Sequence, residues 1–227
     1  MARILILSTA SDVLGDTGKP TGVWYEELAT PYYAFLDAGH EVTLVTLGGK
    51  AIPIDPNSDA TGDDAPASVT RFRADAKATA LLKSPARLED EDVTAYDALY
   101  IPGGHGAMFD LAESDLAAKA IGKAWDSGKV VASVCHGPAA FANALDANGD
   151  PIVKGRKVSA FTDSEERAVG LVEAVPFLLE TRLRELGAEF ESVGDWQPHA
   201  VVDGRLVTGQ NPASSEAAAD KVLALLG

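Results

Sequence analysis

Cysteine is almost absent from this sequence, since Cys135 is the only one among 227 residues. A single cysteine excludes an intramolecular disulfide. The start of the chain runs from Met1 directly into apolar residues without a signal-peptide pattern, which predicts a cytoplasmic protein. Long hydrophobic runs are also missing, because none approaches the ~20 residues that span a bilayer. We therefore expect no membrane role.

Positive charge is scarce as well. There are 19 Lys and Arg residues against 34 Asp and Glu residues, which gives a formal net charge of −15. This balance argues against nucleic acid or an anionic membrane surface as a partner. The four histidines are scattered and lack the spacing of metal ligands, so we expect surface histidines and no metal site.

Apolar residues are plentiful at 46% of the chain, enough for a sizeable core. No internal repeat or linker divides the sequence, so we predict one domain over residues 1–227. Strand-like and helix-like segments alternate, and Asp203-Gly204 predicts a hairpin near the end. We therefore predict a flavodoxin-like three-layer α/β sandwich, with a mostly parallel sheet, helices on both faces and a small C-terminal β-hairpin.

The periodicity of apolar residues gives the expected elements. Strands are predicted at residues 4–7, 41–47, 96–102, 130–134, 157–162 and 189–193, followed by the hairpin at 200–208. Helices are predicted at residues 22–36, 69–83, 116–127, 138–145 and 172–186, and in a last segment that opens at 211–214 and runs to 226. Pro31 predicts a kink or a break in the first helix, and Asp163 is the expected cap of a further helix from Ser164.

The stretch Val130–Ala139 is the most informative part of the chain. It reads as a buried parallel strand that stops at Cys135 and is followed by a tight turn and a helix start. Ligand sites of open α/β sheets lie at this carboxyl edge, and a following helix N-terminus favours an anion. Both effects predict a lowered pKa and a nucleophilic Cys135, whereas a lone cysteine can also be a small buried apolar residue.

A nucleophilic thiol needs a base, a group that orients the base, and donors for an oxyanion. His136 is adjacent in sequence, although neighbours at a sharp turn need not face each other. Glu27 could exchange a proton with the thiol, but the sequence does not distinguish it from Glu26. The strand-end glycines Gly103 and Gly104 could present backbone amides.

Three acids follow the predicted strand that ends at residue 162. Any one of Asp163, Glu165 and Glu166 could orient an imidazole. Helix capping and first-turn charge explain acids at these positions equally well, so the residues alone leave the choice open.

The segments Ile101–Gly106 and Ser133–Pro138 resemble the ThiJ/PfpI superfamily, whose fold is similar to class I glutamine amidotransferase domains. The segment Thr21–Glu27 with Pro31, the segment Phe161–Asp163 followed by Glu166, and the segment Asp203–Ser214 are similar to its heat-shock chaperone and glyoxalase III branch. These motifs extend over nearly the whole chain, and their combination is specific to that branch.

The resemblance implies a role for each matching residue. Cys135 matches the nucleophile, and Glu27 matches the acid beside it. His136 and Glu166 match the other members of a Cys-His-acid triad. The amides of Gly104 and His136 match the oxyanion site, where Gly103 and His105 fit the pattern of the pocket wall.

The function that follows from this resemblance is glutathione-independent conversion of methylglyoxal, or a similar 2-oxoaldehyde, to D-lactate or the matching 2-hydroxy acid. Cys135 would form a hemithioacetal, with a small-molecule aldehyde as the partner and no cofactor. The alternatives are a stress-response holdase chaperone or cysteine redox sensor, and a cysteine peptidase or amidase, including deglycase-type activity. The resemblance also implies a homodimer.

Overall fold

The computed structural model describes residues 1–227 and contains a seven-stranded sheet with the order β3-β2-β1-β4-β5-β9-β8. Neighbouring strands are parallel, except for the antiparallel hairpin of β8 and β9. The strands are β1 (Arg3–Leu7), β2 (Glu41–Thr46), β3 (Ala86–Arg87), β4 (Ala98–Ile101), β5 (Val130–Val134), β8 (Ala200–Asp203) and β9 (Leu206–Gly209). The predicted parallel sheet and C-terminal hairpin are therefore confirmed.

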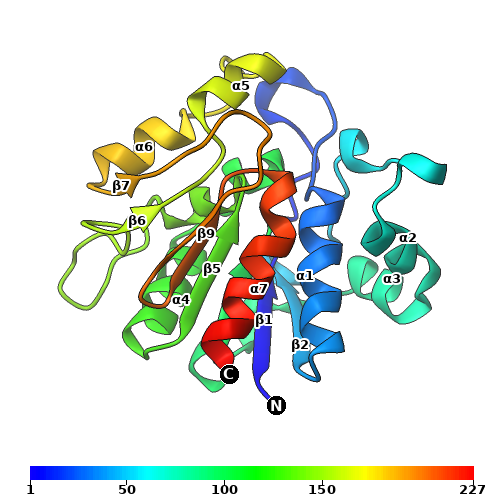
Figure 1. The fold of residues 1–227 in the computed structure, drawn as a ribbon, viewed down its shortest axis with the longest axis horizontal. Coiled ribbons are helices and arrows are strands. Elements are labelled where there is room, and N and C mark those ends of the chain that lie inside the picture. The colour runs from blue at the N-terminus through cyan, green and yellow to red at the C-terminus, as the bar shows by residue number, and fades with distance from the viewer.

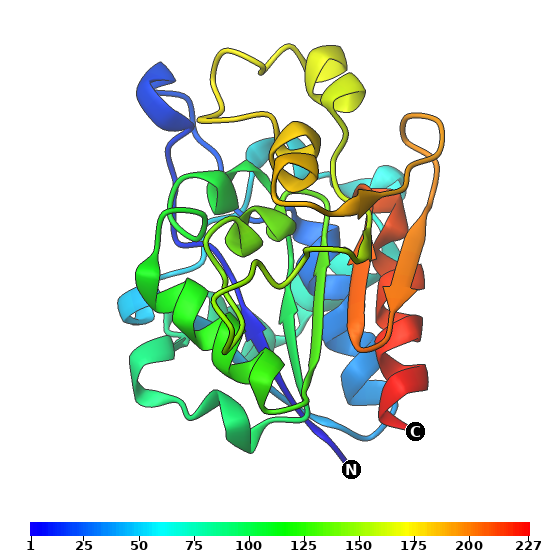
Figure 2. The same cartoon turned by 90° about the vertical axis from the view of Figure 1, so that its left-hand side faces the viewer.

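Helices cover both faces of this sheet (Figures 1 and 2). Helices α1 and α7 lie together on one face, and α4 lies on the other, where it contacts β4 and β5. Helices α5 and α6 lie above the carboxyl ends of the strands, and both chain termini lie at the opposite, amino edge. The helices are α1 (Tyr25–Asp37), α2 (Ala67–Ala74), α3 (Ala76–Lys83), α4 (Asp115–Asp126), α5 (Asp163–Val169), α6 (Leu179–Glu185) and α7 (Ser215–Leu226). The arrangement is the predicted flavodoxin-like sandwich.

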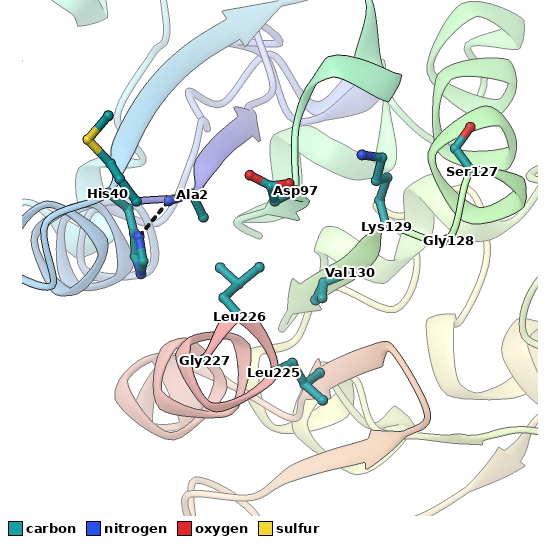
Figure 3. A pocket seen from close by; sticks show the side chains of 11 residues that line it. Ala2, His40, Asp97, Ser127, Gly128, Lys129, Val130, Leu225, Leu226 and Gly227 are labelled. Atoms are coloured by element: carbon teal, nitrogen blue, oxygen red, sulfur yellow. Dashed lines mark hydrogen bonds between the residues drawn. The ribbon is translucent and has the colours of Figure 1, made fainter.

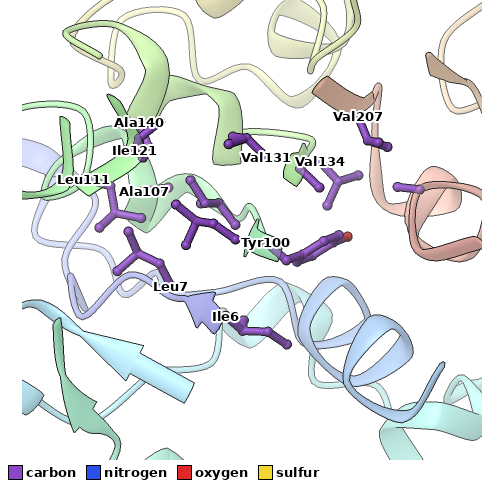
Figure 4. Close-up of a cluster of buried hydrophobic side chains, with 14 of the residues drawn as sticks. Ile6, Leu7, Tyr100, Ala107, Leu111, Ile121, Val131, Val134, Ala140 and Val207 are labelled. Carbon is purple, nitrogen blue, oxygen red and sulfur yellow. The ribbon is translucent and has the colours of Figure 1, made fainter. Parts of the chain in front are cut away.

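The central strands are apolar because both of their faces are covered. All residues of β4 and β5 are buried, and Figure 4 shows side chains such as Tyr100, Val131 and Val134 within the core. Three tyrosines of α1 belong to the same core. Their rings contact Phe72 of α2 and thereby attach that helix to α1; they are Tyr25, Tyr32 and Tyr33.

Two predicted helices are shorter in the structure. The segment 69–83 forms α2 and α3, because the carboxylate of Asp75 accepts hydrogen bonds from the Lys77 and Ala78 amides and starts a second helix. The segment 172–186 is helical only in α6, after a turn that contains Pro176. Conversely, α1 continues through Pro31 without a break.

The region between β5 and the hairpin differs most from the prediction. The predicted strands 157–162 and 189–193 are reduced to β6 (Lys157–Val158) and β7 (Glu189–Phe190), which pair with each other in a separate two-stranded sheet. Residues 137–141 form a short 3₁₀ helix instead of the predicted helix 138–145. Thr162, not Asp163, caps α5 through a capping box with Glu165. Helix α5 lies above the carboxyl edge of the main sheet, whereas Lys157 reaches the opposite edge, where its amide donates to Asp203.

No helix is long and apolar enough to cross a membrane.

Candidate active site

Cys135 lies on a sharp turn directly after β5. Its φ is +59°, a left-handed conformation that is uncommon for a residue with a side chain. Two backbone hydrogen bonds hold this turn: the Cys135 amide donates to Gly209 O, and the Phe161 amide donates to Cys135 O, each at 2.9 Å. The thiol residue is only 2% exposed. The turn therefore presents a buried thiol at the carboxyl edge, where the sequence predicts it.

His136 faces the thiol despite being the next residue in the chain. Its Nδ1 is 3.4 Å from Cys135 Sγ, and its Nε2 is 2.7 Å from Glu166 Oε2. Burial and the neighbouring His105 lower the pKa of His136 to about 4. Burial alone would raise the pKa of Glu166, but hydrogen bonds from His105 and His136 outweigh burial and lower it to about 2.

These pKa values fix where the hydrogens of the His136 ring lie. An ionised carboxylate can only accept hydrogen bonds, so Nε2 of the neutral His136 ring carries the hydrogen and donates it to Glu166. Nδ1 is then an acceptor, and it faces the thiol. The arrangement is a Cys-His-acid triad in which the imidazole is oriented to take the proton of Cys135.

Glu27 approaches the thiol from α1. Its side chain is completely buried, whereas Glu26 is partly exposed, which resolves the choice that the sequence leaves open. Oε2 of Glu27 accepts a hydrogen bond from the Gly103 amide at 2.8 Å. Burial raises the pKa of Glu27 to about 8, although hydrogen bonds from Cys135 and Gly103 offset part of the rise. The carboxyl group therefore holds a proton at neutral pH.

The expected lowering of the Cys135 pKa is wrong. Burial and the nearby Glu27 carboxyl group raise it well above its usual value, and the Gly104 and His136 amides, which donate to the sulfur, lower it only in part. The helix N-terminus that the sequence suggests is a 3₁₀ helix of five residues. A thiol with a raised pKa would need a base in order to react, and Nδ1 of His136 is placed to act as one.

The glycines after β4 allow this close packing. A Cβ on Gly103 would lie 2.6 Å from the His136 amide nitrogen and 2.7 Å from Glu27 Oε2. Gly104 has a φ of +97° and lies against the backbone of Gly22 and Trp24. Any side chain at Gly103 would displace Glu27 or His136, so only glycine at this position lets both residues approach the backbone so closely.

His105 is the second imidazole of the site. Its Nε2 is 2.8 Å from Glu166 Oε1, and its ring centroid is 3.9 Å from that of His136. The expectation of surface histidines is therefore wrong for His105 and His136, which are 8% and 1% exposed. Two strand ends, distant in sequence, bring them together, so ligand spacing along the chain gave no signal. With Glu166 they form a group that could hold a metal ion.

Two further buried residues lie near the triad. Phe161 was not among the candidates that the sequence gives, and Glu165 was a candidate for orienting an imidazole but has another role. The ring of Phe161 lies 4.3 Å from that of His136. Glu165 points away from the histidines and accepts hydrogen bonds from segments that include Trp196 and Asn211. Phe161 and Asn211 appear in the family motifs, and that is the signal that could have identified them. Asp163 also lies away from the histidines, where it accepts a hydrogen bond from Thr181.

A cavity of about 560 Å³ opens beside His105. Its walls are mostly apolar, with Lys19, Asp55 and Asn57 as polar members; the others are Leu14, Pro20, Trp24, Pro56, Val169 and Leu171. Of the candidate site residues, only His105 lines this cavity.

A second cavity, of about 450 Å³, lies at the amino edge of the sheet. Figure 3 shows Asp97, Lys129 and the C-terminal leucines around it, with the Ala2 amide donating to His40 Nδ1. It contains none of the candidate catalytic residues.

Known proteins resemble this chain in both sequence and structure. The chain is 30% identical to Glyoxalase 3 of Candida albicans, over 99% of this chain and 98% of that protein, and 31% identical to the glutathione-independent glyoxalase HSP31 of Saccharomyces cerevisiae, over 95% and 94%. The solved structure of the Rapid Encystment Protein 24 KDa of Francisella tularensis matches with a TM-score of 0.95 at 35% identity, covering all of both chains. That of Candida albicans glyoxalase III matches with a TM-score of 0.87 at 29% identity, covering 98% and 96%. Residues 21–225 match the DJ-1/PfpI family model, and the chain belongs to the DJ-1/PfpI family.

Proposed function

We propose that this protein is a glutathione-independent glyoxalase, which converts methylglyoxal or a similar 2-oxoaldehyde to D-lactate or the matching 2-hydroxy acid. The observation that carries the proposal is the position of the Cys135 sulfur, between the acceptor nitrogen of His136 and the protonated carboxyl group of Glu27. Full-length relatives at about 30% identity bear the name glyoxalase, which supports the same reaction.

The first step is addition of sulfur to the aldehyde carbon. His136 Nδ1 takes the thiol proton as the carbon–sulfur bond forms, and the Glu166 carboxylate stabilises the imidazolium. The aldehyde oxygen becomes an oxyanion, and the Gly104 and His136 amides, which donate to the sulfur before the reaction, are its proposed donors. The product of this step is a hemithioacetal.

The second step moves a proton between neighbouring carbons. Loss of the proton from the former aldehyde carbon gives an enediol, and protonation of the adjacent carbon turns the ketone into an alcohol. Glu27 suits this transfer, because its pKa of about 8 lies close to working pH. It gives its proton to the hemithioacetal oxyanion and then, as a carboxylate, takes the proton of the former aldehyde carbon and returns it to the adjacent carbon. Water then cleaves the resulting thioester, which releases the hydroxy acid and restores the thiol. The net reaction adds one water and needs only acid–base groups.

Burial of the thiol favours a small substrate over a polypeptide. At 2% exposure, Cys135 is within reach of an aldehyde of a few atoms, whereas a peptidase needs an open cleft for an extended chain.

The homodimer remains a prediction, and sedimentation of the purified protein is its direct test.

The test is incubation of the chelator-treated protein with methylglyoxal in the absence of glutathione, with measurement of lactate yield and chirality. We expect enantiopure lactate from the wild type and its loss in both Cys135→Ala and Glu27→Gln. Absence of lactate from a wild type whose Cys135 is reduced and alkylatable would refute the proposal. Peptide hydrolysis and client aggregation would then be the assays to run.

A further inference from the structure

Three metal-ligating atoms converge beside the catalytic thiol. Nε2 of His105 lies 2.8 Å from Oε1 of Glu166, and Nε2 of His136 lies 2.7 Å from Oε2. One ligand atom from each of the three residues lies within 4.8 Å of the other two. All three residues are buried, and no other three His, Cys, Asp or Glu side chains of the chain form such a group. We propose that this group binds one divalent ion of the zinc type and that the bound ion inhibits the enzyme.

The geometry is close to what such an ion requires. Zinc bonds of about 2.0–2.2 Å to nitrogen and oxygen place tetrahedral ligand atoms roughly 3.3 Å apart. The separations of 2.8 Å from His105 to Oε1 and of 2.7 Å from His136 to Oε2 of Glu166 must therefore widen by about 0.5 Å. Any other pair of ligand atoms in the group, all of which lie within 4.8 Å of one another, must move to the same separation. Two neutral imidazoles and a carboxylate are ligands that zinc accepts, and they leave a fourth position for water.

The surroundings supply both access and charge. His105 lines the cavity of about 560 Å³, so an ion can reach the group from solvent. The formal net charge of −15 of the whole chain also favours the approach of a cation.

Inhibition follows from the imidazole of His136, because a metal on one ring nitrogen determines whether the other nitrogen carries a hydrogen. A metal on Nε2 of His136 displaces the hydrogen from that atom, and the neutral ring then carries its hydrogen on Nδ1. Nδ1 faces Cys135 Sγ at 3.4 Å, and with a hydrogen attached it cannot accept the thiol proton. The ion thus inactivates the base without touching the sulfur, which lies on the other side of the ring. This inhibition rests on the proposed function, whereas binding of the ion does not.

Binding is tested without substrate by titrating the chelator-treated protein with Co²⁺ and recording its visible spectrum. We expect one four-coordinate Co²⁺ per chain, displaced by Zn²⁺, with affinity at least ~10-fold lower in His105→Asn and Glu166→Gln. Cys135→Ala and His40→Asn should bind as the wild type does. A wild type without the Co²⁺ band, or a sulfur-to-cobalt charge-transfer band that Cys135→Ala removes, would overturn the proposed ligand set.

The inhibitory effect is tested on the wild type, so it does not depend on the folding of a variant. We expect lactate formation to fall in proportion to the measured Zn²⁺ occupancy and to return when a chelator is added. Full activity at full occupancy would overturn the inhibition. Failure of the glyoxalase proposal looks different, because the protein would then make no lactate even in the absence of metal.

Discussion

Each edge of the sheet has a cavity that a histidine helps to line, but the candidate catalytic residues lie at the carboxyl edge alone. At the amino edge, His40 accepts a hydrogen bond from the Ala2 amide and Asp97 accepts one from the Arg3 amide, beside a cavity of about 450 Å³. At the carboxyl edge, the groups around Cys135 are buried and act on one another's protons. The cavity at the carboxyl edge has a similar volume, about 560 Å³, so the size of the cavity does not distinguish the two edges.

What distinguishes them is burial at the ends of strands. Parallel strands end together, so the turns after β4 and β5 bring Gly103, His105 and Cys135 into one place. Burial there moves the pKa of Glu27 to about 8 and that of His136 to about 4. Four predictions test whether this difference explains the activity.

The largest expected effect is on Glu166, which orients the base. In Glu166→Gln the side-chain amide nitrogen can donate to His136 and favour the tautomer with hydrogen on Nδ1. We expect kcat for methylglyoxal to fall by about 10²–10⁴, as when the orienting acid of other triads becomes an amide. The exposed Glu173 gives a control, Glu173→Gln, with unchanged kcat. A loss below about threefold in Glu166→Gln would remove this residue from the triad.

The next effect is the pH dependence of stability. Glu27 binds its proton more tightly when folded, since its pKa rises from 4.5 to about 8. Its stabilising contribution is therefore complete below pH 4.5 and is lost as the pH rises through about 8. From about pH 5 to about pH 8.5, the wild type should lose about 4 kcal/mol of unfolding free energy relative to Glu27→Gln.

Denaturant unfolding at several pH values measures this difference. Glu26→Gln is the matched control, because Glu26 is partly exposed and its substitution should change the pH profile much less. Parallel pH profiles for the wild type and Glu27→Gln would show that Glu27 does not hold its proton in the folded protein.

A smaller effect is expected where the backbone is tightly packed. Gly103→Ala places a Cβ against the His136 amide and the Glu27 carboxyl group, and it should cost about 1–3 kcal/mol of stability together with most of the activity. A Cβ on Gly194 has no neighbour closer than 3.9 Å, so Gly194→Ala should retain both. Thermal melts and lactate assays of the two variants measure these effects. The same melting temperature and the same lactate formation in Gly103→Ala and Gly194→Ala would contradict the tight packing around Gly103.

The smallest effect is expected at the amino edge. His40→Asn removes an imidazole whose interaction is one hydrogen bond with the Ala2 amide, so we expect at most about 1 kcal/mol of destabilisation. Lactate formation should stay within about twofold of the wild type. A large loss of activity in this variant would end the distinction between the two edges.

Much of this site was predictable from the sequence, because the ends of buried strands can be predicted from it. The apolar runs that end at Ile101 and Val134 predict that the glycines and Cys135 lie at one edge. The convergence of His105, His136 and Glu166 was not predictable from spacing, because the residues come from the ends of β4 and β5 and from helix α5. Family motifs supplied that grouping.

Other features depend on burial, which local sequence does not report. Glu26 and Glu27 are indistinguishable until α1 packs against the sheet, and the sign of the Cys135 pKa shift depends on the carboxyl group that this packing brings. The elements around residues 157–190 are also shorter than predicted, because the β8–β9 hairpin occupies the sheet edge beside β5 and the strand-like segments there pair only with each other.

The most direct test of the account is to identify the covalent intermediate. Protein quenched during turnover of methylglyoxal should carry, on the peptide that contains Cys135, an added mass of one methylglyoxal, and this adduct should disappear as the substrate is exhausted. Mass spectrometry of the digested protein measures it. Continued formation of lactate with no adduct on Cys135 at any time would contradict the claim that this thiol is the nucleophile.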